Sequence, residues 1–438
     1  MIDFAPDPEF QQKVEWARAF VRDKVEPLDA LWPEPTAPYD RSLKPARAIL
    51  KPLQDEVRRQ GLFACHLDKE LGGPGYGQVR FTFINEILGR TNWGPVVFGC
   101  QGPDSGNSEI LARYGTAEQK ARWLAPLLAG EAYSCFSMTE PRGGSDPTLF
   151  TCTASEDGGD WVIDGEKWYS SHANYADFLI VMAVTDPEAP PYERATMFIV
   201  PADTPGVRFI RETGLFTEPP EAKGGHPYVR YDKVRVPDSA RLGPRGQGFA
   251  VAQSRLGGGR IHHAMRTIGL VQKCLDMMAE RALSRELRDG PLSRKQAVQF
   301  DIADTHIALR QFRLQVLHCA WLADREHEGG DPAELREAIS SLKVATANIA
   351  KDVVWRAMHL HGSLGVSNEM PFAHMLMTAA MLGLADGPTE THRSAVARMV
   401  LKGHRPAPGP DPSEHLPTRR AAAQAWLAGA LAAAEQAA

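Results

Sequence analysis

The sequence lacks the common motifs of nucleotide-binding and metal-binding enzymes. No G-x-G-x-x-G follows a strand-like run and opens a helix, so a Rossmann nicotinamide site is not expected. The phosphate loop G-x-x-x-x-G-K-S/T, the zinc motif H-E-x-x-H and the nucleophile motif G-x-S-x-G are absent as well. His262-His263 and His359/His361 are the only close histidine groups. At these spacings a helix points the rings to different sides, so we expect no metal site.

The chain also lacks paired cysteines, long apolar runs and an excess of positive charge. Its six cysteines form no C-x-x-C, which favours free thiols in a reducing cytoplasm. No stretch of about 20 apolar residues is present, so we expect no membrane span. The acidic N-terminus resembles neither a signal peptide nor a transit peptide. A formal net charge of −5 argues against a nucleic-acid binder held by bulk charge.

The periodicity of the apolar residues changes twice along the 438 residues. Helical spacing predicts helices over 8–30, 45–60, 79–92, 106–115 and 117–129, the last with Thr116 as its N-cap. From about residue 132, alternating runs predict short strands, with a hairpin around Asp157-Gly158-Gly159. After Gly248, helical spacing returns over 249–286, 294–327, 332–360, 370–384 and 389–402.

These changes of period predict an α+β protein of three domains and a tail. We expect an all-α N-terminal domain over 1–131, a small antiparallel β-barrel-like middle domain over 132–246 and a C-terminal four-helix bundle over 247–404. Residues 405–438 are expected to form a Pro-rich linker and an Ala-rich, weakly packing helix from residue 421.

The most informative segment is T-E-P-R-G-G-S-D, residues 139–146. It follows an apolar stretch and offers bare backbone N–H groups, hydroxyls and carboxylates. Gly143 and Gly144 carry no Cβ, so such a turn can lie flat against a planar, partly anionic ligand. A β-turn that merely ends a strand is the plainer interpretation of an isolated Gly-Gly-Ser.

Several motifs in a consistent order resemble the acyl-CoA dehydrogenase flavoproteins over roughly residues 8–404. They are E-L-G-G-P-G (70–75), G-T-A-E-Q-K-A-R-W-L-A-P-L-L-A-G-E (115–131), F-S-M-T-E-P-R-G-G-S-D (136–146), G-E-K-W-Y-S-S-H (165–172), R-L-G-G-G-R-I-H-H-A-M-R (255–266), H-L-H-G-S-L-G-V-S (359–367) and L-A-D-G-P-T-E (384–390). Each motif alone is weak evidence, whereas five or more in register are strong evidence.

The resemblance implies a homo-oligomeric FAD enzyme, a homodimer or homotetramer, that acts on an acyl-CoA and passes electrons to an electron-transfer flavoprotein. By resemblance, the residues that contact FAD are Phe136, Met138, Thr139, Gly144, Ser145, Tyr169, Ser171, Arg285, Gln296, His359, Gly362, Ser363 and Glu390. Of these, Arg285 and Gln296 would reach the FAD of a neighbouring subunit. Ser145, Arg260 and Asp386 would contact the substrate. Without the motif, Tyr169 would be read as a strand aromatic that fills the core.

The resemblance also implies the catalytic base. Most members carry a glutamate in Y-E-G-T, where this chain has Ala385-Asp386-Gly387-Pro388, the form of a smaller branch that includes domains fused to a kinase-like domain. Other members place a glutamate where this chain has Gly259. We therefore expect Asp386 to abstract the α-proton while hydride passes to flavin N5, with the backbone N–H of Asp386 helping to hold the thioester oxygen.

The same residues allow a purely structural interpretation of Asp386. Gly387 would be an N-cap, Pro388 the first helical residue and Glu390 a carboxylate that suits the helix dipole. Both interpretations can hold together, because they concern mostly different atoms. A carboxylate at 386 is also about 1.5 Å shorter than the glutamate it replaces, which points to an altered substrate range.

Three alternatives to the dehydrogenase remain open at this stage. The same fold could serve an acyl-CoA oxidase or a flavin monooxygenase, both of which react with oxygen. It could also be a non-catalytic, nucleic-acid-binding flavoprotein, which the acidic balance disfavours.

Overall fold

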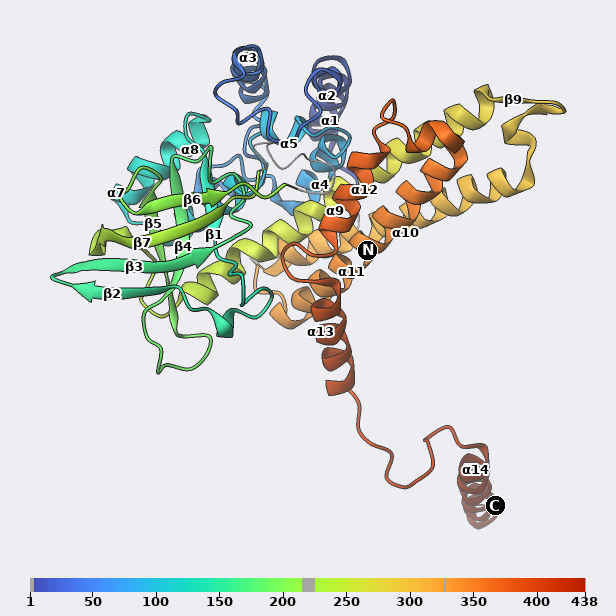
Figure 1. The fold of residues 1–438 in the computed structure, drawn as a ribbon. Coiled ribbons are helices and arrows are strands. Elements are labelled where there is room, and N and C mark those ends of the chain that lie inside the picture. Colours follow the sequence, from blue (N-terminus) through green and yellow to red (C-terminus); the bar gives the residue numbers. More distant parts are fainter. Residues whose placement is uncertain (1–3, 215–224, 327, 438) are drawn as a thin grey trace. The chain divides into compact units, whose positions relative to one another are not determined.

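The computed structural model describes residues 4–214, 225–326 and 328–437 (Figure 1). Two compact units divide the chain, the first ending at His392 and the second spanning Arg393–Ala438. The first unit contains a helical N-terminal part, a β-sheet and a long-helix part, in that order along the chain.

The N-terminal part consists of helices, two of which begin at a polar capping side chain. Asp7 accepts a hydrogen bond from Phe10 N, and Thr116 forms the predicted cap as a capping box with Gln119. The single helix predicted over 8–30 is divided by a π-helical turn at Val21–Val25. The helices are α1 (Pro8–Phe20), α2 (Glu26–Leu31), α3 (Lys44–Arg59), α4 (Gly77–Leu88), α5 (Gly94–Val97), α6 (Asp104–Tyr114), α7 (Ala117–Gln119) and α8 (Ala125–Ala129), with a second π-helical turn (Lys120–Leu124) between the last two.

The eight strands of the middle part form one mixed sheet. Its path is β6-β7-β3-β2-β4-β5-β8, and β1 pairs with β4. The strands are β1 (Ser134–Ser137), β2 (Thr153–Asp157), β3 (Asp160–Lys167), β4 (Phe178–Val184), β5 (Ala195–Pro201), β6 (Val207–Arg211), β7 (Tyr228–Pro237) and β8 (Arg241–Leu242). Among the described residues, the two ends of this path, β6 and β8, do not pair, so the sheet does not close into a barrel.

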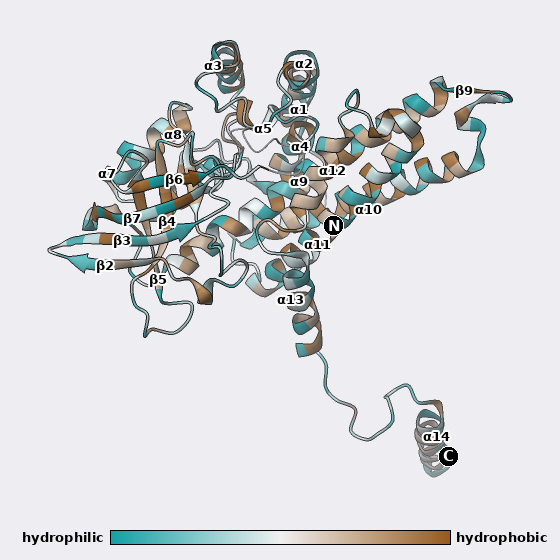
Figure 2. Ribbon diagram, viewed as in Figure 1, coloured by the Kyte–Doolittle hydropathy of each residue, from teal (hydrophilic) through white to brown (hydrophobic). Residues whose placement is uncertain are grey.

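The predicted hairpin is present, while most pairings of the sheet join distant segments. β2 and β3 pair antiparallel across Gly158-Gly159, but β1 pairs with β4 in parallel. β4 and β5 are almost wholly buried, and Figure 2 shows brown, hydrophobic strands in the middle of the sheet. Strands buried on both faces read as continuous apolar runs, which matches these two segments.

Long helices build the last part of the first unit. They are α9 (Gly248–Ser284), α10 (Gln296–Glu326), α11 (Pro332–His361), α12 (Phe372–Leu382) and the start of α13 (Thr389–Lys402). The short strands β9 (Glu286–Leu287) and β10 (Gly290–Pro291) form a hairpin between α9 and α10. α11 packs against α9, α10 and α12, while α4 packs against α9 and α10. Short 3₁₀ turns lie at Lys69–Leu71, Pro147–Leu149, Asp238–Ala240, Leu292–Arg294 and Gly362–Val366.

Two glycines bring α4 and α9 into backbone contact. A Cβ at Gly269 would lie 2.0 Å from Glu86 O, and a Cβ at Gly89 would lie 1.9 Å from Arg266 O. Only residues without a side chain allow this approach, which fixes α9 against the N-terminal part.

The second unit contains the rest of α13 and α14 (Leu416–Ala437). α14 begins five residues earlier than the Ala-rich segment predicted. None of the helices in the described part of the chain is both long and apolar enough for a membrane span. The architecture confirms the predicted α+β class, while the domain limits at 131, 246 and 404 stay predictions.

Candidate active site

The Gly-rich turn after β1 leaves an open, partly apolar surface. Phe136 and Met138 are half-buried, whereas Gly144 and Ser145 are exposed. A Cβ at Gly144, whose φ is +30°, would meet no atom within 4 Å. Gly143 has a different role, since a Cβ there would lie 2.7 Å from the Phe150 ring. Gly143 therefore allows the turn to pack against Phe150, and Gly144 leaves open space beside the turn.

A buried ion pair ties this turn to the second expected flavin-contact segment. Lys167 Nζ lies 2.8 Å from Glu140 Oε1 and donates to Met138 O at 2.8 Å. The side chains of Lys167 and Glu140 are 0% and 2% exposed. Glu140 also accepts hydrogen bonds from Thr151 and from Cys152 N. Sequence reasoning quoted both residues inside motifs but missed their pairing, which holds the two segments together.

Trp168 and Tyr169 extend this connection to the surface. Trp168 N donates to Thr139 O at 3.0 Å. Tyr169 has a φ of +49° and is 45% exposed. A bulky residue with positive φ is unusual, and such strain clusters at ligand sites. The exposure excludes the alternative that Tyr169 merely fills the core. Ser171 Oγ shares a hydrogen bond of 2.9 Å with His226 Nδ1.

Helix α9 contributes three consecutive glycines, Gly257 to Gly259, next to this region. A Cβ at Gly257 would meet nothing within 4 Å. A Cβ at Gly259 would have one neighbour within 4 Å, Asp386 Oδ2 at 3.5 Å. Arg255, on the same helix, places its guanidinium 4.0 Å from the centre of the Phe136 ring and donates to Asn107 Oδ1. The helix thus joins the turn after β1 to Asp386.

Asp386 lies in the turn between α12 and α13 with a φ of +56°. Its backbone carbonyl accepts a hydrogen bond from Arg260 Nε at 2.9 Å and contacts His392 Nε2 at 3.3 Å. Its side chain is 20% exposed. Helix α13 begins at Thr389, directly after Gly387-Pro388, and Glu390 lies exposed in its first turn. The helix thus begins one residue later than the structural interpretation expected, since Thr389 and not Pro388 is its first residue. The structure brings Arg260 and Asp386 together, and the catalytic role of Asp386 stays a prediction.

Positive groups gather around this carboxylate. Burial lowers the pKa of Arg255 and of Arg260, and the charge of Asp386 opposes that shift in both. Burial likewise lowers the pKa of Lys343 to about 8, again opposed by Asp386. Lys343 also donates to Leu382 O. His263 Nε2 lies 3.7 Å from Asp386 Oδ2. Of these groups only Arg260 was assigned a role from the sequence, although Arg255 and His263 belong to the same motif, and Lys343 lies outside every quoted motif.

The remaining expected cofactor residues lie at the other end of α9. Arg285 follows the helix directly, 25 residues after Arg260, which at 1.5 Å per residue is about 38 Å away. A Cβ at Gly362 would lie 3.3 Å from Arg285 Nη1, so these two residues are brought together. Gln296 is the first residue of α10, and His359 lies in the last turn of α11. Both side chains are exposed, as is Ser363. Within one chain this group does not meet Asp386.

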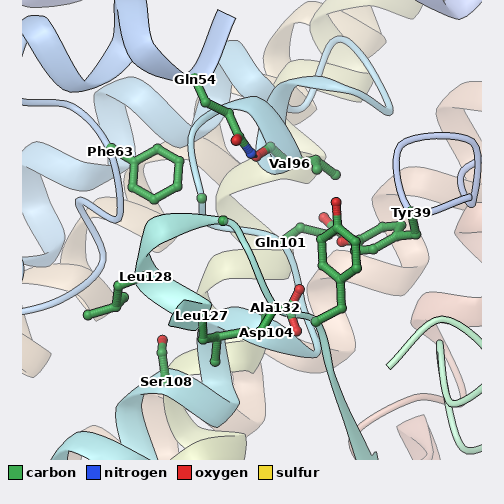
Figure 3. Close-up of a pocket in the computed structure, with 13 residues that line it drawn as sticks. Tyr39, Gln54, Phe63, Val96, Gln101, Asp104, Ser108, Leu127, Leu128 and Ala132 are labelled. Atoms are coloured by element: carbon green, nitrogen blue, oxygen red, sulfur yellow. The ribbon is translucent and has the colours of Figure 1, made fainter. Parts of the chain in front are cut away.

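A small cavity of about 40 Å³ lies in the N-terminal part (Figure 3). Tyr39, Gln101 and Asp104 line it, and the buried Tyr39 hydroxyl has no hydrogen-bond partner. Asp104 accepts bonds from Ser134 N at 2.8 Å and Ser134 Oγ at 2.6 Å. Burial raises the pKa of Asp104 to about 7 despite these bonds. A polar cavity of this size holds about one water.

Family models match most of the chain. They are the acyl-CoA dehydrogenase N-terminal domain over residues 7–131, the middle domain over 135–216 and the C-terminal domain over 246–401. The probable acyl-CoA dehydrogenase FadE2 of Mycobacterium tuberculosis is 37% identical over 370 residues, which cover 83% of this chain and 88% of that relative. The chain belongs to the acyl-CoA dehydrogenase family.

Other acyl-CoA dehydrogenase relatives are longer or are known as structures. Mouse acyl-CoA dehydrogenase family member 10 is 38% identical over 90% of this chain, which spans only 37% of that relative's length. The structure of a putative acyl-CoA dehydrogenase from Mycobacterium abscessus matches with a TM-score of 0.82 and 39% identity, covering 92% of this chain and all of the other. A glutaryl-CoA dehydrogenase from Mycobacterium smegmatis, in complex with FADH2, matches with a TM-score of 0.72 and 25% identity over 91% and 96% of the two chains.

The residue types around the Gly-rich turn suit a flavin. The half-buried Phe136 and Met138 offer an apolar surface, and the exposed Tyr169 offers an aromatic ring. Gly144 and Gly257 leave space that a Cβ would fill. A planar ring with a polar edge and a phosphate chain needs this combination of apolar face and bare backbone.

Proposed function

We propose that this acyl-CoA dehydrogenase desaturates an acyl-CoA thioester between its α- and β-carbons, with FAD as cofactor. One observation carries the proposal. The carboxylate of Asp386 faces a glycine surface of α9, while its backbone is held by Arg260. Positions 255 and 259 lie one turn apart on α9, and Arg255 contacts Phe136. The carboxylate of Asp386 and the expected flavin-contact residue Phe136 therefore lie on the same side of this helix.

The residues that would hold FAD belong to two groups. Phe136, Met138 and Thr139 would line the ring, with Tyr169 and Ser171 beside them, and Gly144 and Ser145 would meet the pyrophosphate. Arg285, Gln296, His359, Gly362 and Ser363 would hold the FAD of a neighbouring subunit, and Glu390 would contact the cofactor as well. When bound, FAD supplies the acceptor for the hydride that leaves the β-carbon.

Asp386 would remove the α-proton, which requires an ionised carboxylate beside the substrate. Within the described part of the chain, the N–H of Asp386 donates no hydrogen bond. It is therefore available to hold the thioester oxygen as negative charge develops. Arg260 and Ser145 would contact the substrate. Arg260 already donates a hydrogen bond to the carbonyl of Asp386 in the turn before α13.

An oligomer would explain why the two groups of expected FAD-contact residues lie far apart within one chain. Phe300, Ile307 and Leu314 recur every seven residues on α10, and their side chains are 58%, 52% and 58% exposed. Apolar residues at this spacing share one helix face, which a second copy of the chain would bury. We propose a homodimer or homotetramer in which this face lies between subunits, so that Arg285 serves the neighbouring site.

Three further assignments rest on the sequence pattern. The A-D-G-P motif supports membership of the branch with an aspartate base. An electron-transfer flavoprotein is the proposed electron acceptor, in a reaction of fatty-acid β-oxidation. The six cysteines are all free and buried, which supports a reducing compartment such as the cytoplasm.

The test is anaerobic titration of the purified holoenzyme with acyl-CoAs of graded length and branching. The wild-type protein should lose its flavin absorbance near 450 nm with at least one of them. Asp386→Asn should bind FAD and the acyl-CoA but keep its colour. Asp352→Asn is the matched control, since Asp352 is an exposed carboxylate of α11 that belongs to neither residue group, and should bleach like the wild type. Bleaching of Asp386→Asn at the wild-type rate would refute the base, and a colourless protein that takes up no FAD would refute the whole proposal.

The purified holoenzyme also distinguishes the proposed dehydrogenase from an oxidase, a monooxygenase and a nucleic-acid-binding flavoprotein. An oxidase or monooxygenase would consume oxygen with acyl-CoA in air and, for an oxidase, release peroxide without an added acceptor. The proposed dehydrogenase should instead need an added acceptor for turnover. Retention on DNA that falls with salt would favour a nucleic-acid-binding flavoprotein.

A further inference from the structure

His263 lies between Asp386 and Arg266 on the inner face of α9. Its Nε2 is 3.7 Å from Asp386 Oδ2, and its Nδ1 is 3.2 Å from Arg266 Nη2. His263 and Arg266 are three residues apart on the helix, so their side chains share one face. The imidazole thus has a different partner at each of its two nitrogens.

The contact with Arg266 determines which nitrogen of His263 carries a proton. A guanidinium only donates hydrogen bonds, so Nδ1 accepts from Arg266 and carries no hydrogen. Burial, and next the charge of Arg266, lower the pKa of His263 to about 4, so the ring is neutral at neutral pH. A neutral imidazole has one proton, which therefore lies on Nε2, the nitrogen that faces Asp386.

Arg266 is itself fixed from two sides. Its Nη1 donates to Cys100 O at 3.3 Å, in the segment after α5. Its backbone lies against Gly89, the residue that follows α4, where a Cβ would be 1.9 Å from Arg266 O. The guanidinium is therefore anchored to the N-terminal part, and it holds the imidazole of His263 in one orientation.

We propose that His263, kept in its Nε2–H form by Arg266, is a positioning residue. Its Nε2 lies 3.7 Å from Oδ2 of Asp386, which is longer than a hydrogen bond. The N–H closes on Oδ2 when the substrate is bound and leaves Oδ1 to take the α-proton. The inference rests on the proposed role of Asp386 as base. The backbone of Asp386 is fixed through its carbonyl by Arg260. The side chain still rotates, and a short carboxylate has little reach to compensate for a wrong orientation, so an oriented donor improves its alignment.

The first experiment observes the imidazole directly and needs no turnover. The full chain is labelled with ¹⁵N in the histidine rings, and the His263 signals are identified by their loss in His263→Gln. At pH 7, Nδ1 should give the shift of an unprotonated nitrogen and Nε2 that of an N–H. In Arg266→Met, the signals should move toward a mixture of the two neutral forms. A proton on Nδ1 in the wild type, or unchanged signals in Arg266→Met, would overturn the proposal.

The second experiment measures the function of the donor in the holoenzyme. His263→Leu removes the N–H, whereas His263→Gln keeps one. We expect His263→Leu to lower kcat about 10- to 100-fold with KM nearly unchanged, and His263→Gln to recover most of the loss. The acid limb of the kcat–pH profile should move to higher pH by about one unit in His263→Leu, because the carboxylate loses a donor.

The other groups that face Asp386 stay in place in these variants. They are Arg255 and Arg260 of α9, Arg266, Lys343 of α11 and His392 at the start of α13. A merely structural role for His263 would lower thermal stability without moving the acid limb. A wild-type kcat and acid limb in His263→Leu, or equal losses in the Leu and Gln variants, would overturn the positioning role. Failure of the base itself would appear differently, as activity in Asp386→Asn.

Discussion

The Cβ position of Gly259 lies 3.5 Å from Oδ2 of Asp386. The two places at which relatives are expected to carry the base therefore face one volume from opposite sides. A carboxylate entering from α9 would occupy the space that Asp386 uses in this chain.

This geometry predicts that a carboxylate at position 259 can replace the proposed base at position 386. Asp386→Gly should be inactive, and the double variant Asp386→Gly/Gly259→Glu should regain flavin reduction by about tenfold or more over the single variant. The matched control is Asp386→Gly/Gly257→Glu, because a Cβ at Gly257 does not approach position 386. Stopped-flow absorbance under nitrogen measures the rates. Equal rates in the two double variants would show that the Gly259 side does not face the α-carbon.

The buried pair of Lys167 and Glu140 should contribute strongly to stability. Lys167→Met leaves an unpaired buried carboxylate and should lower the free energy of unfolding by about 3–5 kcal/mol. Lys167→Met/Glu140→Gln should lose less, since the charge is removed as well. The exposed pair of Lys295 and Asp289 is the control, and Lys295→Met should cost little. Urea unfolding of the four proteins gives the comparison, and equal losses for Lys167→Met and Lys295→Met would contradict the prediction.

Two glycines of α9 should respond oppositely to the same substitution. Gly269→Ala forces a methyl group onto Glu86 O and should destabilise the FAD-free chain by about 3 kcal/mol. Gly257→Ala meets no neighbour within 4 Å and should stabilise the FAD-free chain by up to about 1 kcal/mol through helix propensity. Thermal unfolding without FAD distinguishes them. A stable Gly269→Ala would mean that α4 and α9 separate easily.

Asp104 should make stability depend on pH. Its pKa is raised to about 7 by burial, above the value of about 3.9 in an unfolded chain. The folded protein therefore holds a proton that the unfolded chain has released, and the stability this provides below pH 4 is lost as the pH rises through 7. Asp104→Asn keeps an acceptor for Ser134 but does not titrate. Its unfolding free energy should fall less between pH 5 and pH 8, by at most about 1.4 kcal/mol per pH unit. Parallel pH profiles for the two proteins would contradict the assignment.

The exposed face of α10 should control assembly. Ile307→Asp places a charge in the middle of this face and should convert the oligomer into a smaller species on light scattering. Ile210→Asp is the control, because Ile210 is 51% exposed on β6, away from α10. An unchanged mass for Ile307→Asp would place the subunit interface elsewhere.

The long helices could be predicted from the sequence because their signal is local. The amphipathic period of α9 to α11, and the Thr116 cap, depend on neighbours within a few residues. The same holds for the hairpin at Gly158-Gly159. The π-helical turn at Val21–Val25 was missed, since its extra residue per turn leaves the apolar spacing almost unchanged.

The site was predicted less completely, because its contacts join distant segments. Motifs indicated Asp386 and Arg260 by resemblance, and the structure brings them together. No pattern indicated that Lys167 pairs with Glu140, or that Arg266 and Cys100 meet. The parallel pairing of β1 with β4 was equally invisible, because a strand's own alternation does not reveal its partner.

The left-handed backbone at Asp386 has a consequence for the choice of amino acid there. Aspartate and asparagine tolerate a positive φ better than most side chains, because their short polar group can bond locally. A glutamate at 386 would add conformational strain to a turn already anchored by Arg260. The length of the side chain at 386 and the shape of the loop are therefore coupled, and Asp386→Glu alone should strain the turn.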